Sequence, residues 1–207
     1  EVWILSLNGA VFLDRDGVLI EENGYIASIE QIKFIENSHE AIKLINRLNL
    51  YCIIITNQPV VARGEANEDD INKIHDYIKK YYSNKDAYID AIYYCPHHPD
   101  RGFKGENVRY KMVCDCRKPN IGLITEAINH YNIDVTKSFM IGDTTTDIQT
   151  GINSGCKTIL VKTGHAGMDQ KYDVIPDYVC LDVYNSIKLI NTLLWLIYFK
   201  ITKLCEW

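Results

Sequence analysis

AVFLDRDGVLI, residues 10–20, is an apolar stretch that ends in two aspartates, separated by one residue and followed by glycine. Its first four residues are typical of a strand that is covered on both faces. Asp14 and Asp16, spaced i and i+2, can point the same way beyond the strand, and Gly17 permits a sharp turn there. Burying two carboxylates is costly without a cation. The stretch therefore predicts a magnesium-bound nucleophile with a neighbouring acid/base; a solvated turn built on aspartate side chains is the alternative.

The length, charge and cysteines of the chain limit its class. Its 207 residues predict a single domain that can bury a core without disulfides. A formal net charge of −5, with no basic run, argues against nucleic acid as a partner. Seven cysteines, an odd number with a cluster within residues 95–116, favour a metal site over a disulfide framework. Because residues 1–9 show no signal-peptide pattern, we expect a cytoplasmic protein.

The C-terminal part of the chain contains an unbroken apolar run, residues 193–199. The run falls short of the ~18 residues that a membrane-spanning helix needs, so we expect no membrane span. We predict a helix that closes the core; an interfacial helix or an oligomer contact is the alternative. We expect a monomer, with a dimer through the terminal segments as the alternative.

Helical and strand-type patterns alternate along the chain. The sequence predicts helices over residues 38–48, 67–82, 121–131 and 147–154, and further strands over residues 51–55, 87–94, 138–141, 157–161 and 178–179. This alternation predicts an α/β fold of the Rossmann type, with a mostly parallel sheet and helices on both faces. Ligands of such sheets bind beyond the carboxyl ends of the strands. The polar motifs of this chain lie at such ends.

A second carboxylate cluster follows a later strand, in FMIGDTTTD, residues 139–147. Asp143 comes directly after the strand, and Asp147 falls in the first turn of the next helix. If this strand neighbours the first, Asp143 faces Asp14 and Asp16. Oxygen donors without histidine suit Mg²⁺ rather than Zn²⁺. A helix N-cap followed by an acid that the helix dipole favours is the alternative, above all for Asp147.

Hydrogen-bond donors and cations for a phosphate group stand at two other loop ends. Thr56 and Asn57 follow the second strand and offer a hydroxyl, an amide and backbone N–H groups. Arg117 and Lys118 precede a helix. Lysine supplies a point charge and arginine a planar fork that suits two phosphate oxygens. These four residues are candidates for phosphate binding.

Four motifs thus stand in order along the chain: DRDGVL, TNQ, CRKP and GDxxxD. They resemble the four motifs of phosphatases of the haloacid dehalogenase (HAD) superfamily. Within that superfamily the chain resembles the small zinc-containing branch, the D-glycero-D-manno-heptose 1,7-bisphosphate 7-phosphatases and the histidinol-phosphate phosphatases. The resemblance covers residues 10–195 and implies one HAD-type domain without a large cap. Residues 1–9 and 196–207 are extra to it.

The resemblance also implies roles for the motif residues. It makes Asp14 the nucleophile that forms an aspartyl-phosphate, and Asp16 the acid/base. The Mg²⁺ ligands would be the Asp14 carboxylate, the Asp16 backbone carbonyl and Asp143, and the phosphoryl group would be held by Thr56, Asn57 and Lys118. One position departs from the pattern. Thr144 stands where these phosphatases often carry lysine, which leaves Lys118 as the main cation.

The cysteine cluster has the spacing C-x-H…C-x-C, with Cys95, His97, Cys114 and Cys116 as its members. Three thiolates and one imidazole describe a closed, structural Zn²⁺ site. His98 is the alternative histidine; the pattern of the family favours His97. Zinc here would order the loop over residues 95–119 and help to shape the substrate pocket.

The favoured substrate is a phosphorylated sugar, and two features of the sequence concern its identity. Gly24 and Tyr25 belong to a stretch similar to His-Gly-Tyr-Val of the heptose bisphosphatases, and with Arg117 they are candidates to contact the sugar or a second phosphate. Sixteen residues separate His97 from Cys114, a longer loop than in histidinol-phosphate enzymes. The heptose interpretation is therefore favoured over histidinol phosphate, with a polynucleotide 3′-phosphatase or a silent zinc-stabilised binding module less favoured.

Overall fold

The computed structural model describes residues 8–204, with side chains as far as Leu196. In this part of the chain six parallel strands form one sheet in the order β3-β2-β1-β4-β5-β6. The strands are β1 (Ala10–Leu13), β2 (Tyr51–Asn57), β3 (Ala91–Cys95), β4 (Phe139–Gly142), β5 (Lys157–Val161) and β6 (Tyr178–Cys180). The predicted α/β fold is confirmed, with β1 between β2 and β4. Residues 1–7 and 205–207, which belong to the extra terminal segments, lie outside the described residues.

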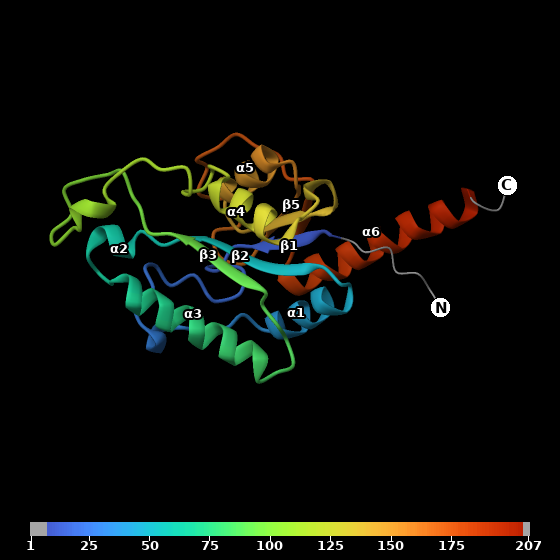
Figure 1. Ribbon diagram of the computed structural model, residues 1–207, viewed down its shortest axis with the longest axis horizontal. Helices are drawn as coiled ribbons and strands as arrows, with labels where there is room; N and C mark the ends of the chain where they lie inside the picture. Colours follow the sequence, from blue (N-terminus) through green and yellow to red (C-terminus); the bar gives the residue numbers. More distant parts are fainter. Residues whose placement is uncertain (1–7, 205–207) are drawn as a thin grey trace.

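Helices cover both faces of the sheet. The α-helices are α1 (Ser38–Arg47), α2 (Val60–Arg63), α3 (Glu68–Ser83), α4 (Gly122–Tyr131), α5 (Thr145–Ser154) and α6 (Val183–Leu204), and 3-10 helices span Ile29–Gln31, Val108–Tyr110 and Val135–Lys137. α1, α3 and α6 lie on one face, and α4 and α5 on the other (Figure 1). A hydrophobic core lies on each face of the sheet, and β1 contributes to both because its side chains alternate. Val11 and Leu13 pack on the first face, and Ala10 and Phe12 pack on the second.

Two predicted boundaries are wrong. β3 begins at Ala91, four residues later than predicted, and just before it the Asp90 N–H donates to the Cys52 carbonyl while the Asp90 carboxylate accepts from the Cys52 N–H. α5 begins at Thr145, two residues earlier than predicted, because Thr144 is its N-cap. The other predicted elements are present, with ends shifted by two residues or fewer.

α6 is longer than the strands that it covers. A helix of 22 residues is about 33 Å long, whereas a five-residue strand spans roughly 17 Å, so α6 continues past the edge of the sheet (Figure 1). Val183 and Ile187 in its first turns are fully buried. Trp195 is 59% exposed and Leu196 45% exposed. Leu193 and Leu194, which begin the apolar run, are partly buried against the core, so the prediction of a core helix is right for them and wrong for Trp195 and Leu196.

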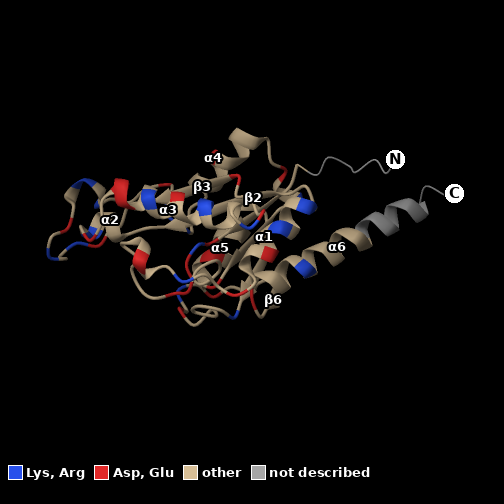
Figure 2. Cartoon of the chain, turned by 90° about the horizontal axis from the view of Figure 1, so that it is seen from below, with Lys and Arg blue, Asp and Glu red and all other residues tan. Residues whose placement is uncertain are grey.

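The surface of the described part carries both signs of charge. Basic and acidic residues are interspersed along the chain in Figure 2. Within the residues that the structure describes, no helix has the length and apolar character that crossing a membrane requires.

Candidate active site

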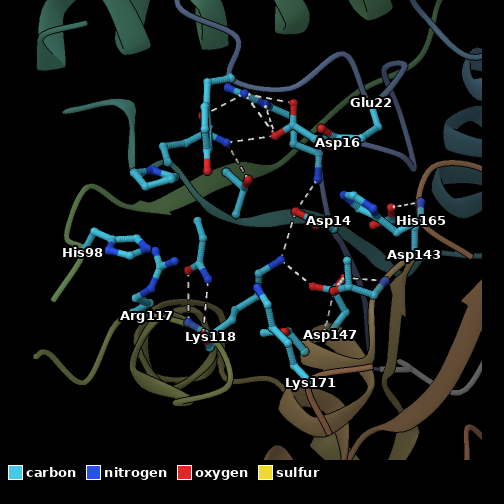
Figure 3. A pocket seen from close by; sticks show the side chains of 18 of the residues that line it. Asp14, Asp16, Glu22, His98, Arg117, Lys118, Asp143, Asp147, His165 and Lys171 are labelled. Atoms are coloured by element: carbon cyan, nitrogen blue, oxygen red, sulfur yellow. Dashed lines mark hydrogen bonds and ion pairs between the residues drawn. The ribbon is translucent and has the colours of Figure 1, made fainter. Parts of the chain in front are cut away.

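The carboxyl ends of β1 and β4 bring the two predicted carboxylate clusters together. The two strands are parallel neighbours with Leu13 opposite Ile141, and the Asp14 N–H donates to the Ile141 carbonyl at 2.9 Å. As a result, carboxylate oxygens of Asp14, Asp143 and Asp147 lie within 4.8 Å of one another. They line a pocket of about 670 Å³ at this edge of the sheet (Figure 3).

The charges of this cluster do not balance without a cation. Lys118 Nζ lies 2.9 Å from Asp14 and 2.5 Å from Asp147, so three carboxylates face one ammonium group. Burial raises the pKa of Asp14 to about 7 even though Lys118 opposes the shift. Burial, together with the charges of Asp14 and Asp147, raises the pKa of Asp143 to about 8. An oxygen-only set of donors with two excess negative charges fits Mg²⁺.

Lys118 is held in place through its backbone as well as its ammonium group. Burial alone would lower its pKa, but Asp14 and Asp147 outweigh burial and raise it. The Asn57 carboxamide donates to the Lys118 carbonyl at 3.2 Å and accepts from the Lys118 N–H at 3.0 Å. Asn57, predicted to bind phosphate, therefore uses its side chain to position the lysine. Thr56, also predicted to bind phosphate, is buried and lines the pocket.

Thr144, the position that departs from the family pattern, caps α5. Its hydroxyl donates to the Asp147 carboxylate at 2.5 Å, and its N–H donates to the same carboxylate at 3.1 Å. The capping alternative considered for Asp147 is therefore correct, although Asp147 also pairs with Lys118. A further cation comes from elsewhere in the chain, because Lys171 lines the same pocket.

The Asp16 side chain lies outside the carboxylate cluster and binds a buried arginine. Arg15 donates from Nε to Asp16 Oδ2 at 3.1 Å and from Nη2 to Asp16 Oδ1 at 3.0 Å. Gln58 Nε2 donates to Asp16 Oδ2 at 2.9 Å. Sequence reasoning missed Arg15 and Gln58, although the position of Gln58, directly after the Thr56-Asn57 pair at a strand end, was a usable signal.

A loop that follows β5 also reaches Asp143. The His165 N–H donates to Asp143 Oδ2 at 2.7 Å, and Thr163 Oγ1 donates to the Gly17 carbonyl at 2.6 Å. Gly17 has a φ of +75°, and a Cβ atom there would meet the Asp143 carboxylate. The glycine is therefore required for the close approach of the two strand ends. Sequence reasoning missed His165, because a residue that acts through its backbone leaves no side-chain signature.

The residues predicted to contact substrate form another part of the pocket wall. Gly24 and Tyr25 both line the pocket, and the Arg63 guanidinium lies 4.0 Å from the centre of the Tyr25 ring. Arg117 also lines it, with Nη1 donating to the His97 carbonyl at 3.0 Å. Arg63, a cation that sequence reasoning missed, therefore stands beside the three predicted residues.

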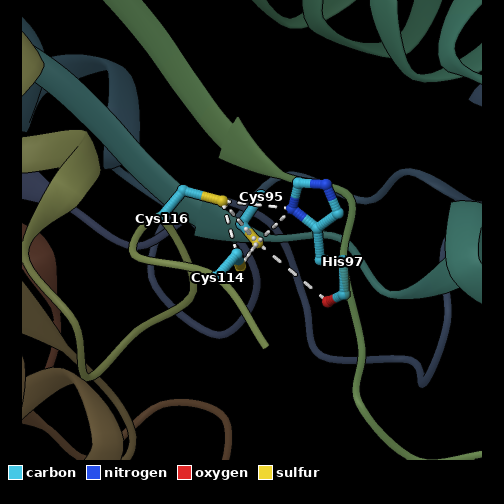
Figure 4. Close-up of side chains that lie close together, drawn as sticks. All are labelled: Cys95, His97, Cys114 and Cys116. Atoms are coloured by element: carbon cyan, nitrogen blue, oxygen red, sulfur yellow. Dashed lines mark hydrogen bonds between the residues drawn. The ribbon is translucent and has the colours of Figure 1, made fainter. Parts of the chain in front are cut away.

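The four predicted zinc ligands come together at the end of β3 (Figure 4). The three Sγ atoms of Cys95, Cys114 and Cys116 are 3.0–3.5 Å apart, and His97 Nδ1 lies 3.2 Å from Cys116 Sγ. These separations are too long for disulfides and near the ~3.8 Å edge of a tetrahedron of thiolates around zinc. Burial raises the pKa of Cys116 to about 11, so the thiolate form requires a divalent cation. The cluster fits a structural Zn²⁺ ion.

His98, the alternative zinc ligand, does not join this cluster. Its Nδ1 accepts from the Asp100 N–H at 3.2 Å, and the residue lines the active-site pocket instead. The choice of His97 over His98 agrees with this geometry.

A central strand that ends in Asp-x-Asp, a neighbouring strand that ends in Gly-Asp and a lysine between their carboxylates define a hydrolase of the HAD type. Residues 115–186 match the family model described as HAD-hydrolase-like. The D,D-heptose 1,7-bisphosphate phosphatase of B. bronchiseptica, solved with magnesium and phosphate, superposes with a TM-score of 0.77. The match is 27% identical and covers 89% of this chain and 98% of that one.

Relatives by sequence identify the family. The chain is 36% identical to the D-glycero-beta-D-manno-heptose-1,7-bisphosphate 7-phosphatase of Haemophilus influenzae over 188 residues, which are 90% of this chain and 99% of the relative. The enzyme of the same name from Pasteurella multocida is 40% identical over 75% of this chain and 82% of its own length. The chain belongs to the D-glycero-D-manno-heptose-1,7-bisphosphate 7-phosphatase family, and the resemblance drawn from the four motifs is confirmed.

Proposed function

We propose that the chain removes the 7-phosphate of D-glycero-D-manno-heptose 1,7-bisphosphate, in the synthesis of nucleotide-activated heptose for lipopolysaccharide or capsule. The observation that carries the proposal is the match to the Haemophilus influenzae phosphatase over 99% of that protein. The carboxylate cluster, the buried lysine and the pocket supply the groups that such a reaction needs. Residues 10–195 are the proposed catalytic domain.

Asp14 is the proposed nucleophile. Its carboxylate attacks phosphorus, the bond from phosphorus to the sugar oxygen breaks, and an aspartyl-phosphate forms. Lys118, 2.9 Å from Asp14 Oδ1, offsets the repulsion between the carboxylate and the phosphate dianion. A magnesium ion held by Asp14, Asp143 and the Asp16 carbonyl would supply the rest of that neutralisation. Asp147 is left out of this ligand set because Lys118 and the helix cap already engage its oxygens.

Asp16 is the proposed acid/base. The sugar oxygen leaves as an alkoxide unless it is protonated, so a carboxylic acid beside it lowers the barrier. After the sugar departs, the same carboxylate takes a proton from the water that attacks the aspartyl-phosphate, the bond from phosphorus to the Asp14 oxygen breaks, and inorganic phosphate leaves. Hydrolysis is thereby divided into two displacements that share one acid/base group.

The sugar and its second phosphate are proposed to occupy the part of the pocket beyond the carboxylates. Arg63, Arg117 and Lys171 line that pocket with Gly24 and Tyr25, so cations surround the position where a second phosphate would lie. A cavity of about 670 Å³ is of the size that small ligands fill. The reduced thiols of the zinc cluster suit a cytoplasmic location. We propose a monomer, with a dimer through the terminal segments as the alternative.

The test is magnesium-dependent phosphate release from a panel of substrates. We expect turnover of heptose 1,7-bisphosphate, assayed as both the α and the β anomer, to exceed that of histidinol phosphate and of a 3′-phosphorylated oligonucleotide. Asp14→Asn should abolish turnover of all of them, whereas Asp69→Asn, an exposed residue of α3 that does not line the pocket, should not. Preferential turnover of histidinol phosphate would overturn the proposed substrate. Unchanged turnover in Asp14→Asn would overturn the nucleophile.

A further inference from the structure

The Arg15 guanidinium is a fully buried charge that the reaction described above does not use. Its side chain is 0% exposed, so its N–H groups need partners within the protein. Nη2 donates to Asp16 Oδ1 at 3.0 Å and to Gln58 Oε1 at 2.8 Å, which uses both of its hydrogens. Nε donates to Asp16 Oδ2 at 3.1 Å, and Nη1 lies 3.4 Å from His75 Nε2. The arginine therefore ties together Asp16 and Gln58, which follow β1 and β2, and His75 of α3.

Gln58 has a single orientation in this unit. Its Nε2 donates to Asp16 Oδ2 and to Thr56 Oγ1, both at 2.9 Å, while its Oε1 accepts from Arg15. Rotating the carboxamide by half a turn would place its oxygen against the Asp16 carboxylate and its NH₂ against the guanidinium. Both contacts would be repulsive, so the glutamine side chain is fixed.

His75 closes the unit on its far side. The residue is 6% exposed, and burial, with the Arg15 charge, lowers its pKa to about 3. The imidazole is therefore neutral, and its Nε2 lone pair faces the Arg15 Nη1. The Tyr94 ring packs edge-on against it with the ring centres 5.2 Å apart. This packing limits movement of the arginine away from Asp16.

The hydrogen bonds divide the two oxygens of Asp16 into different roles. Oδ2 accepts from both Arg15 Nε and Gln58 Nε2, which fills its two lone-pair directions. Among the described residues, Oδ1 accepts one hydrogen bond, from Arg15 Nη2, and Asp16 lines the active-site pocket. Of the two oxygens, Oδ1 is the one with room for a proton.

We propose that Arg15, Gln58 and His75 are positioning residues that anchor Asp16 through Oδ2 and aim Oδ1 at the leaving group. The proposal rests on the function proposed above, in which Asp16 is the acid/base. The proton on Oδ1 passes to the sugar oxygen as the bond from phosphorus to that oxygen breaks. Oδ1 then accepts a proton from the water whose oxygen attacks the aspartyl-phosphate, which restores the acid.

The dependence of turnover on the leaving group tests this positioning. A sugar alkoxide needs the proton from Asp16, whereas p-nitrophenolate leaves without one. Since general acid–base catalysis contributes about 10²- to 10⁴-fold, we expect Gln58→Met to lower kcat/KM for heptose bisphosphate by roughly 10- to 100-fold. The same variant should change kcat/KM for p-nitrophenyl phosphate by less than about threefold, because kcat/KM reports the steps up to departure of the leaving group, and p-nitrophenolate departs without a proton from Asp16. His75→Phe, which keeps an aromatic ring beside Tyr94, should show a smaller loss with the same selectivity.

Controls separate positioning from other causes. Gln149→Met makes the same change on α5, where Gln149 bonds only to Asn153 among the contacts of its side chain that are described, and should leave both substrates unaffected. Equal losses for both substrates in Gln58→Met would overturn the proposal, because they would show that the glutamine acts on the phosphate site through Thr56. Unchanged turnover of both would overturn it as well. Failure of the proposed function differs from failure of the positioning proposal, because it would appear as turnover that survives Asp14→Asn.

Discussion

Replacing Lys118 with methionine tests whether charge holds the carboxylate cluster together. The ammonium lies 2.9 Å from Asp14 and 2.5 Å from Asp147, and the lysine side chain is 3% exposed. Removing one partner of a buried ion pair costs about 3–5 kcal/mol, since the charge left behind stays buried without compensation. We expect Lys118→Met to lower the free energy of unfolding of the magnesium-free protein by about 3–5 kcal/mol and to abolish turnover.

The measurement is urea unfolding, with Lys43→Met as the matched control. Lys43 pairs with Glu40 at 3.1 Å, and the two side chains are 24% and 40% exposed. A partly exposed pair of this kind contributes about 1 kcal/mol or less. The double variant Lys118→Met/Asp147→Asn should recover part of the stability, because it removes one of the two stranded charges. Its turnover should stay lost, because Asp14 still lacks its cation.

Two results would refute this reasoning. If Lys118→Met unfolds at the same urea concentration as Lys43→Met, the buried ammonium does not stabilise the cluster. If the effects of Lys118→Met and Asp147→Asn simply add in the double variant, the two side chains are not energetically coupled. Retained turnover in Lys118→Met would further show that the phosphoryl group does not depend on this charge.

Three further perturbations have definite expected outcomes. Cys116→Ser should bind well under one zinc per chain and expose residues 98–113 to limited proteolysis; a resistant loop without zinc would contradict the structural role of the cluster. Because burial raises the pKa of Asp14 to about 7 and of Asp143 to about 8, both carboxyls bind more protons when folded. The magnesium-free protein should therefore lose thermal stability as the pH rises from about 4 to about 8. Magnesium at ten times its Kd should raise the free energy of unfolding by about 1.4 kcal/mol at pH 8 and by less at pH 5. An equal increase at both pH values would contradict magnesium binding by the ionised carboxylates. Gly17→Ala, strained by a φ of +75° and by the Asp143 carboxylate, should lower both Tm and kcat; an unchanged Tm would show that the strand ends can separate without cost.

The parts of the site that lie at strand ends were predictable from the sequence. Asp14 and Asp143 each follow an apolar stretch, and parallel neighbours place such ends side by side. The zinc ligands were predictable for another reason, since the ligand spacing itself is chemically distinctive. In both cases the information is local in the chain.

The parts that depend on contacts between distant residues were not predictable. Arg15 looks like an exposed arginine between two aspartates, and its burial follows from Gln58, 43 residues away, and His75, 60 residues away. Asn57 has the side chain of a phosphate ligand, but the backbone of Lys118, 61 residues later, takes both of its hydrogen bonds. Such assignments need the folded geometry, because residue type alone permits several partners.

The zinc cluster separates two tasks of the active site, positioning the groups that transfer the phosphoryl group and shaping the wall of the substrate pocket. Cys95 ends β3, and Cys116 stands two residues before Lys118, so the four ligands fix the entry to the lysine segment whatever the intervening chain does. The sixteen residues between His97 and Cys114 are closed at both ends, and doubling the length of such a loop costs only about 0.6 kcal/mol. Insertions, deletions and substitutions there can remodel the wall that meets the sugar while the phosphoryl-transfer groups keep their positions. Selection can therefore act on which phosphate ester is accepted without disturbing how it is cleaved, and a duplicated copy of this chain has a short evolutionary route to a new substrate.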